Sequence, residues 1–184
     1  MNTSFPPHTL ESAPPEARRS MEVTARRMGY LPAPVARLAT SPQLLDAFLR
    51  ASGLFEAGTL DPLARETLIL TIATRNGCHV CVAMHTAALV RLGAPEALID
   101  ALRAGDQLPD ERLDAVRVFT LEVLATAGAV SPSAMDAFLA HGFTPRNALE
   151  VVLGIGAFTM STLANRMTEA PLDEQLAAYG WDAA

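Results

Sequence analysis

One local signal recurs along this sequence and limits what the chain can fold into. A small polar residue precedes a proline, and an apolar pattern with spacings of three and four residues follows; this happens at Ser41-Pro42, Asp61-Pro62, Ser131-Pro132 and Thr144-Pro145. Such a polar side chain caps a helix N-terminus, and proline is tolerated at the first helical position. No stretch shows a sustained two-residue alternation, which a half-buried strand would need. The sequence therefore predicts an all-α fold.

The same signals predict where the helices and the domain begin and end. Helices are expected at 16–28, 42–53, 62–75, 78–92 and 132–141. A short helix is expected to begin after Pro34, and another short one to end at 104. Two long helices are expected, one from about 110 to just before 128 and one that begins at 145. We expect residues 1–15 to form a flexible leader and 16–170 to form a single all-helical domain. Residues 171–184 are expected to form a C-terminal tail that packs on the body or on a neighbouring subunit.

Composition excludes several classes of function. The 184 residues are 50% hydrophobic and 18% charged, which is enough apolar material for a packed core. The net charge is −6, whereas nucleic-acid binding needs clustered positive charge. All 14 basic residues are arginines, which excludes catalysis by a lysine Schiff base. We therefore predict a single-domain protein without a nucleic-acid partner.

The sequence also favours a cytoplasmic protein without a membrane partner. Residues 1–16 contain four prolines and no apolar segment of the kind found in secretory signals. No uninterrupted apolar run approaches the roughly 18 residues that a membrane-spanning helix needs. In a reducing compartment, a Cys-x-x-Cys motif is more often catalytic, redox-active or metal-binding than a structural crosslink.

The chain's only two cysteines form such a motif, Cys78-His79-Val80-Cys81, and His85 follows four residues later. Positions 78, 81 and 85 share one face of a helix, next to its N-terminus. Unpaired N–H groups at a helix N-terminus stabilise a thiolate, and an imidazole can exchange a proton with the sulfur chemistry. These observations leave open which of the two sulfurs reacts first.

Glu66 is the expected partner of His85. If helices 62–75 and 78–92 fold back at the turn 76–77, residue 66 lies opposite about residue 87, within one helical turn of His85. A carboxylate that orients an imidazole, which in turn serves a sulfur, is a proton relay. His79 is expected to face solvent or to tune the pair electrostatically.

Two other interpretations compete with a redox site. Zinc would need four ligands, and only Cys78, Cys81 and His85 lie close together in the sequence. The cysteines could also be inert core residues, because free cysteine packs well as a small apolar side chain.

The pattern Glu66, Cys78-His79-Val80-Cys81 and His85 resembles the signature of the alkylhydroperoxidase AhpD-like family, part of the carboxymuconolactone decarboxylase superfamily. Leu60-Asp61-Pro62 and Arg75-Asn76-Gly77 fit as well, and the resemblance is greatest to the peroxidase-related branch. The family often carries a second histidine directly before the second cysteine; here that position is Val80 and the histidine is His79.

The resemblance implies an AhpD-like helical bundle, a homo-oligomer and a thiol-dependent peroxidase. Cys81 would be the peroxidatic thiol, Cys78 would resolve it to a disulfide, and His85 and Glu66 would relay protons. No cofactor and no metal would be needed. The partners would be a hydroperoxide substrate and a dithiol reductant or reductase protein. The alternatives are a non-catalytic redox sensor, a general disulfide-exchange protein or a metal-binding protein.

Overall fold

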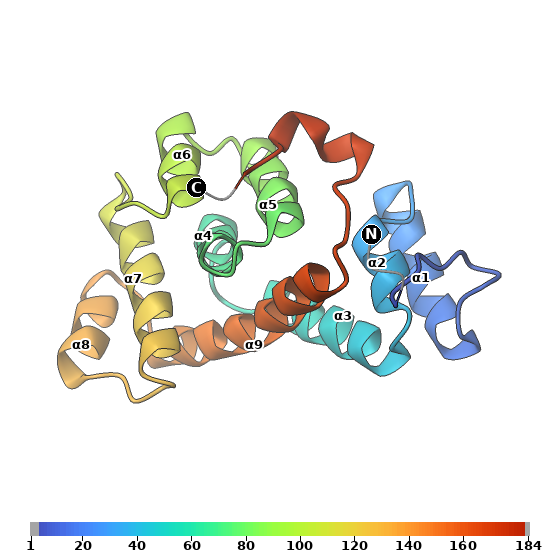
Figure 1. Ribbon diagram of the computed structural model, residues 1–184. Helices are drawn as coiled ribbons and strands as arrows, with labels where there is room; N and C mark the ends of the chain where they lie inside the picture. The colour runs from blue at the N-terminus through green and yellow to red at the C-terminus, as the bar shows by residue number, and fades with distance from the viewer. Residues whose placement is uncertain (1–3, 183–184) are drawn as a thin grey trace.

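The computed structural model describes residues 4–182, and within this range helices are the only regular secondary structure (Figure 1). The all-α prediction is therefore confirmed. The nine α-helices and one 3₁₀-helix are α1 (Pro15–Met28), α2 (Ala33–Leu38), α3 (Pro42–Glu56), α4 (Pro62–Arg75), α5 (His79–Arg91), α6 (Glu96–Ala104), α7 (Glu111–Ala125), α8 (Pro132–Ala140), α9 (Pro145–Met167) and η1 (Glu174–Tyr179).

The four predicted caps form. The side chains of Ser41, Asp61 and Ser131 each accept a hydrogen bond from the backbone N–H three residues on. Thr144 forms a capping box with Asn147, in which each side chain bonds the other's backbone N–H. The helix α3 continues to Glu56, three residues beyond its predicted end. These caps explain why local sequence located most helix starts correctly.

The helix α4 lies at the centre of the molecule. It packs against α5, α6, α7 and α9, while α3 packs along α9 and α1 packs on α3 (Figure 1). In α4, Leu68 and Ile72 on one face and Leu70 on the opposite face are all fully buried. A helix that is apolar on all sides is typical of a buried core helix. The Cys-x-x-Cys segment begins directly after this helix and is therefore held by the most buried part of the fold.

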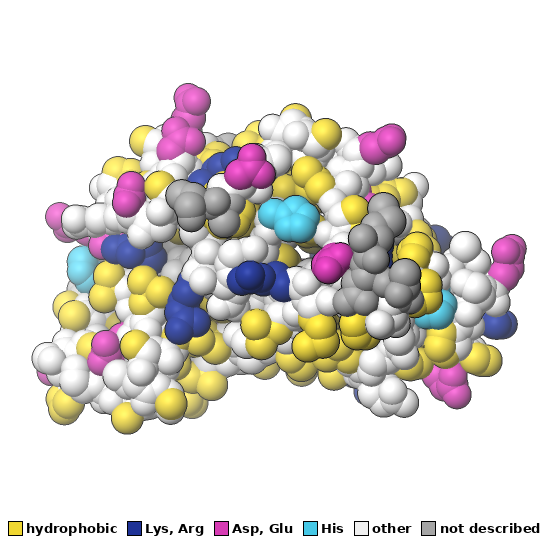
Figure 2. Space-filling view, viewed as in Figure 1, with side chains coloured by type: hydrophobic (Ala, Val, Ile, Leu, Met, Phe, Trp, Pro, Cys, Tyr) yellow, Lys and Arg dark blue, Asp and Glu magenta, His cyan; other side chains and the backbone are white. Residues whose placement is uncertain are grey.

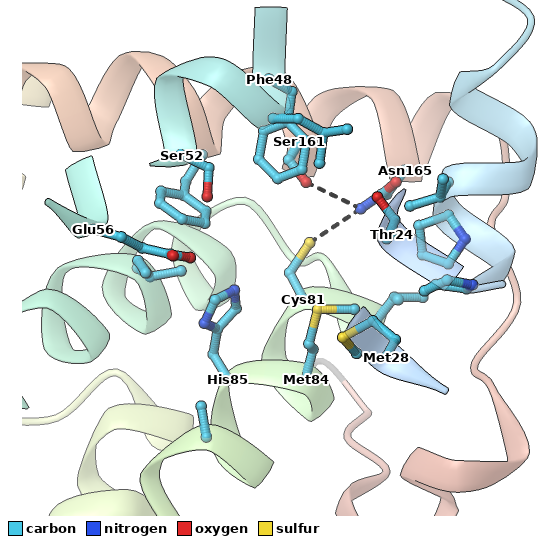
Figure 3. Close-up of a pocket in the computed structure, with 18 of the residues that line it drawn as sticks. Thr24, Met28, Phe48, Ser52, Glu56, Cys81, Met84, His85, Ser161 and Asn165 are labelled. Carbon is cyan, nitrogen blue, oxygen red and sulfur yellow. Dashed lines mark hydrogen bonds between the residues drawn. The ribbon is translucent and has the colours of Figure 1, made fainter. Parts of the chain in front are cut away.

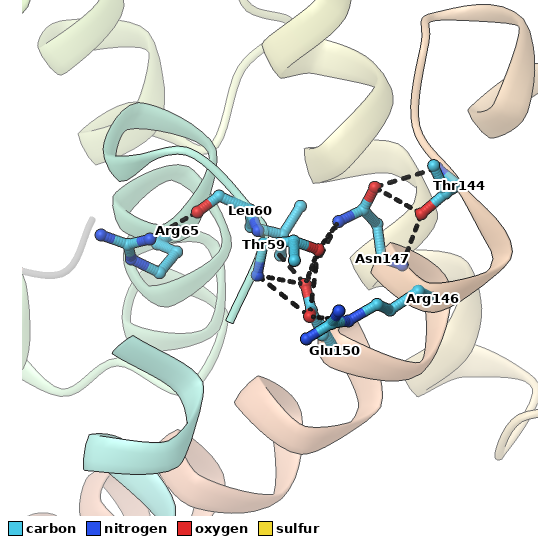
Figure 4. A network of polar contacts seen from close by, with 7 residues as sticks. All are labelled: Thr59, Leu60, Arg65, Thr144, Arg146, Asn147 and Glu150. Carbon is cyan, nitrogen blue, oxygen red and sulfur yellow. Dashed lines mark hydrogen bonds and ion pairs between the residues drawn. The ribbon is translucent and has the colours of Figure 1, made fainter. Parts of the chain in front are cut away.

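A buried carboxylate, Glu150, fixes the connection between α3 and α4. It accepts hydrogen bonds from the backbone N–H groups of Thr59 and Leu60 and from the Thr59 hydroxyl, at 2.9–3.2 Å (Figure 4). Asn147 and Arg146 also donate to it. These donors lower the pKa of Glu150 against the opposing effect of burial. The network ties α9 to the loop that starts α4.

The helix α9 is long and apolar enough to span a membrane by length and composition alone, with a mean hydropathy of 1.4 in its most apolar window. In this structure 56% of that window is buried inside the protein. Gly154 lets α9 approach its neighbours closely: a Cβ there would lie 2.7 Å from the Phe55 ring and 2.8 Å from Leu68. The helix is thus a core element of this fold.

The two ends of the described chain lie against the body. His8 N–H donates to the Ala36 carbonyl at 3.0 Å, and Arg37 donates to the Phe5 carbonyl at 2.5 Å. These two bonds tie the leader to α2 at Phe5 and His8, and its flexibility stays a prediction. At the other end, Trp181 Nε1 donates to the Arg103 carbonyl at 3.1 Å. The tail therefore packs on α6 of its own chain.

Charged side chains are scattered over the face shown in Figure 2. Acidic and basic groups are interspersed there, with hydrophobic atoms between them. On this face, the described residues do not form an extended basic surface of the kind that tracks a nucleic-acid backbone. The absence of a nucleic-acid partner stays a prediction.

Candidate active site

The two cysteines lie side by side at the start of α5. Cys78 is the N-cap residue and Cys81 is in the first turn, and their Sγ atoms are 2.6 Å apart. Both thiols are free and both residues are buried, with 1% and 6% of their surface exposed. The predicted helix began at Cys78, whereas α5 begins at His79. This one-residue difference places Cys78 where unpaired helix N–H groups meet its sulfur.

The pKa values of the two thiols are shifted in opposite directions. The hydrogen bond between the two sulfurs and a second one from the Cys81 backbone N–H lower the pKa of Cys78 despite burial. The pKa of Cys81 is raised well above its ordinary value, because its proton is held by Cys78 and because the sulfur is buried.

Glu66 and His85 meet as the turn geometry predicted. The Nδ1 atom of His85 lies 2.7 Å from Oε2 of Glu66, across the antiparallel pair α4 and α5. Both side chains are largely buried, with 15% and 18% exposed. The His85 ring also packs edge-on against Phe158 of α9, at 5.4 Å between centroids. Because Nδ1 is bonded to the carboxylate, Nε2 is the ring atom left for proton transfer.

Asn165 is a site residue that sequence reasoning missed. Its Nδ2 atom donates to Cys81 Sγ at 3.3 Å and to Ser161 Oγ at 3.3 Å (Figure 3). Both side chains are buried and both favour the thiolate of Cys81. The sequence does contain a sign of a functional helix face here, because Ser161 and Asn165 are polar residues four apart on an otherwise apolar helix. No local pattern indicates that this helix face packs against Cys81.

The site opens into a pocket of about 400 Å³. Cys81 and His85 line it, and Figure 3 shows them facing the same space with Phe48, Met84 and Asn165 around it. Cys78 does not line the pocket. The lining comes from α1, α2, α3, α4, α5 and α9 and is mostly apolar. A ligand in the pocket would thus meet Cys81, with Cys78 behind it.

His79 is not part of this group of site residues. It is exposed on the first turn of α5, as expected. Among the described residues, no three or more His, Cys, Asp or Glu side chains are grouped so that they could hold a metal ion. The Nδ1 atom of His85, which a metal could have used, is bonded to Glu66. The donor set therefore does not favour the metal-binding alternative.

Part of the chain matches the model of a known protein family. Residues 42–119, the segment that contains Glu66, the cysteines and His85, match the model of the Carboxymuconolactone decarboxylase family. A comparison with curated proteins finds no match.

Several solved structures share the fold. An AhpD-core, peroxidase-related protein from Ralstonia eutropha JMP134 has a TM-score of 0.81 at 21% identity, with 94% of this chain and 93% of that chain covered. A peroxidase-related protein from Silicibacter sp. TM1040 has a TM-score of 0.72 at 20% identity, covering 89% and 87%. The debrominase Bmp8 has a TM-score of 0.74 at 17% identity, covering 97% of each chain.

The fold and the match define the class as AhpD-like helical proteins with a Cys-x-x-Cys at a helix N-terminus. The chain has the AhpD-like fold, and its residues 42–119 resemble the carboxymuconolactone decarboxylase family, as the sequence signature implied. The debrominase shows that this fold also serves other chemistry.

Proposed function

We propose that this protein is a cysteine-based peroxidase that reduces organic hydroperoxides through a Cys78–Cys81 disulfide. One observation carries the proposal: two free thiols adjoin each other, and one of them, Cys81, lines an apolar pocket that a Glu66–His85 pair also lines. The peroxidase-related names of structures with the same fold are consistent with it.

In the first step, Cys81 attacks the substrate because it is the sulfur that lines the pocket. Its proton passes to Cys78, and the Cys81 thiolate attacks the terminal oxygen of the hydroperoxide. The O–O bond breaks, sulfur is oxidised to a sulfenic acid and an alkoxide leaves. His85, oriented by Glu66, donates a proton to the alkoxide, which departs as the alcohol.

In the second step, Cys78 resolves the sulfenic acid. Its sulfur attacks Cys81 Sγ, the S–O bond breaks, and the proton that Cys78 took from Cys81 passes to the leaving hydroxide, so that the disulfide and water form. Cys78 is well placed because its sulfur adjoins Cys81 and its pKa is lowered. A dithiol reductant, or a reductase protein that carries one, then reduces the disulfide and closes the cycle.

The test is peroxide consumption by dithiol-reduced, metal-free protein beside the variants Cys81→Ser and Cys78→Ser. We expect the wild type to turn over, Cys81→Ser to be inactive, and Cys78→Ser to react once and stop as a sulfenic acid. Mass spectrometry identifies the oxidised sulfur. Single-turnover oxidation of the Cys81→Ser variant would reverse the two roles.

General disulfide exchange is the second candidate, and the lowered pKa of Cys78 favours it because exchange needs an available thiolate. It predicts that the wild type cycles between dithiol and disulfide with a small disulfide but consumes no hydroperoxide. A non-catalytic sensor would show neither disulfide exchange nor peroxide turnover. Assays of disulfide exchange and of peroxide consumption on one preparation separate these alternatives.

We also propose a homo-oligomer in the cytoplasm. Exposed apolar side chains form one stripe along α9, at Leu149, Val152, Leu163 and Met167. A stripe of this kind marks an interaction surface. Sedimentation of Leu163→Arg beside Val118→Arg, a half-exposed position on α7, tests this: only the α9 variant should reduce the oligomer mass.

A further inference from the structure

The substrate pocket has a reactive end and a cationic end. The α5 side chains that line it lie on one face of the helix, with Val80 and Cys81 first, Met84 and His85 next, then Ala88, and Arg91 last. Ten residues of α-helix separate Cys81 from Arg91, which is roughly 15 Å along the axis. The space between them is bordered by apolar side chains from neighbouring helices, including Phe48, Ile69 and Phe158.

The pocket is lined by more positively charged side chains than carboxylates. Both carboxylates that line it already have a partner: Glu66 bonds His85 at 2.7 Å, and Glu56 pairs with Arg27 at 3.2 Å. Two further guanidinium groups line the same pocket, those of Arg65 and Arg91. Among the described residues neither forms an ion pair, and Arg65 donates to the Leu60 carbonyl. The pocket thus carries two positive charges without a carboxylate partner.

Guanidinium groups bind carboxylates through paired, charge-assisted hydrogen bonds, and an apolar cavity binds hydrocarbon. A volume of about 400 Å³ also exceeds what hydrogen peroxide would fill. We infer that this pocket binds an amphipathic organic acid, with its apolar body along α5 and its carboxylate held by Arg65 and Arg91. Under the proposed function, on which this part rests, the acid carries a hydroperoxide group that lies at Cys81.

The test measures binding without relying on turnover. Decanoate, which has no peroxide group, is added to the Cys78→Ser variant while an uncharged alkylating reagent modifies Cys81. Decanol is the uncharged comparison, and the rate of alkylation at increasing ligand concentration gives the Kd. The same titration is repeated with Arg65→Gln and Arg91→Gln added, singly and together, and with Arg50→Gln, an exposed position on α3 outside the pocket, as the matched control.

We expect decanoate to protect Cys81 more strongly than decanol does. We expect the double arginine variant to raise the decanoate Kd about tenfold, and Arg50→Gln to leave it unchanged. Equal protection by decanol and decanoate, absence of protection, or an unchanged Kd in the double variant would overturn the inference. The single variant Arg91→Gln, at an exposed position, provides the test if the double variant does not fold.

The two proposals fail in different ways. Protection by decanoate in a protein that consumes no hydroperoxide would refute the peroxidase alone and leave the acid-binding pocket standing. If both hold, kcat/KM for a fatty-acid hydroperoxide should exceed that for its methyl ester, and this preference should fall in the Arg65→Gln/Arg91→Gln protein.

Discussion

Asn165 of α9 donates a hydrogen bond from Nδ2 to Cys81 Sγ of α5 at 3.3 Å. The last long helix of the chain therefore contacts the cysteine sulfur directly. A hydrogen bond to sulfur stabilises the thiolate and offsets part of the burial that raises the pKa of Cys81. The site is therefore completed by a residue from outside the α4–α5 hairpin.

Replacing Asn165 should slow the reaction of Cys81. Asn165→Ala removes a donor worth about 1–1.5 kcal/mol, so we expect the neutral-pH peroxide rate to fall about tenfold and the pH–rate profile to move to higher pH. Asn165→Asp should slow it further, because a carboxylate repels a thiolate. Stopped-flow oxidation across pH measures both, and an unchanged profile in Asn165→Ala would show that the contact does not act on the sulfur.

Glu66 should act through the orientation and charge of His85. We expect Glu66→Ala to lower the peroxide rate by about a hundredfold and Glu66→Gln by about tenfold, since glutamine keeps an acceptor but loses the charge. Glu22→Gln, an exposed position on α1, is the matched control. Steady-state kinetics with an organic hydroperoxide measure the effect. Equal activity of Glu66→Ala and the control would exclude a relay.

Glu150 should make folding stability fall in acid. Its folded pKa is lowered, so the stability that it contributes is complete above the ordinary carboxyl range and is lost as pH falls through the folded pKa. Glu150→Ala leaves buried donors of Thr59 and Leu60 unpaired and should cost about 2–3 kcal/mol at neutral pH. Urea denaturation at several pH values measures both effects. The acid slope should flatten in Glu150→Gln, and a parallel slope would assign the acid sensitivity elsewhere.

Two glycines of α9 should respond in opposite directions to alanine. A Cβ at Gly154 would overlap the ring of Phe55, so we expect Gly154→Ala to lower the free energy of unfolding by about 1–3 kcal/mol. At Gly156 nothing lies within 4 Å of a Cβ, so Gly156→Ala should raise it by about 0.5–1 kcal/mol. Urea denaturation of the pair measures this. Destabilisation by both would mean that α9 needs glycine for another reason.

The sequence alone predicted most of the helices and the Glu66–His85 part of the site, because both depend on residues that are close together in the chain. Helix caps at Ser41, Asp61 and Thr144 act on N–H groups only three residues away, so sequence alone located them. The Glu66–His85 contact also followed from sequence, because the turn between α4 and α5 is too short to allow anything but an antiparallel hairpin.

Tertiary structure decided what depends on contacts between distant segments. Asn165 lies 84 residues from Cys81, and Glu150 lies 91 residues from Thr59, so no local pattern could pair them. It also decided which sulfur faces the pocket and which arginines line it, because that cavity lies between helices from both ends of the chain. Caps and short turns are set by hydrogen bonds within a few residues, whereas a pocket exists only where separate helices pack and leave space between them.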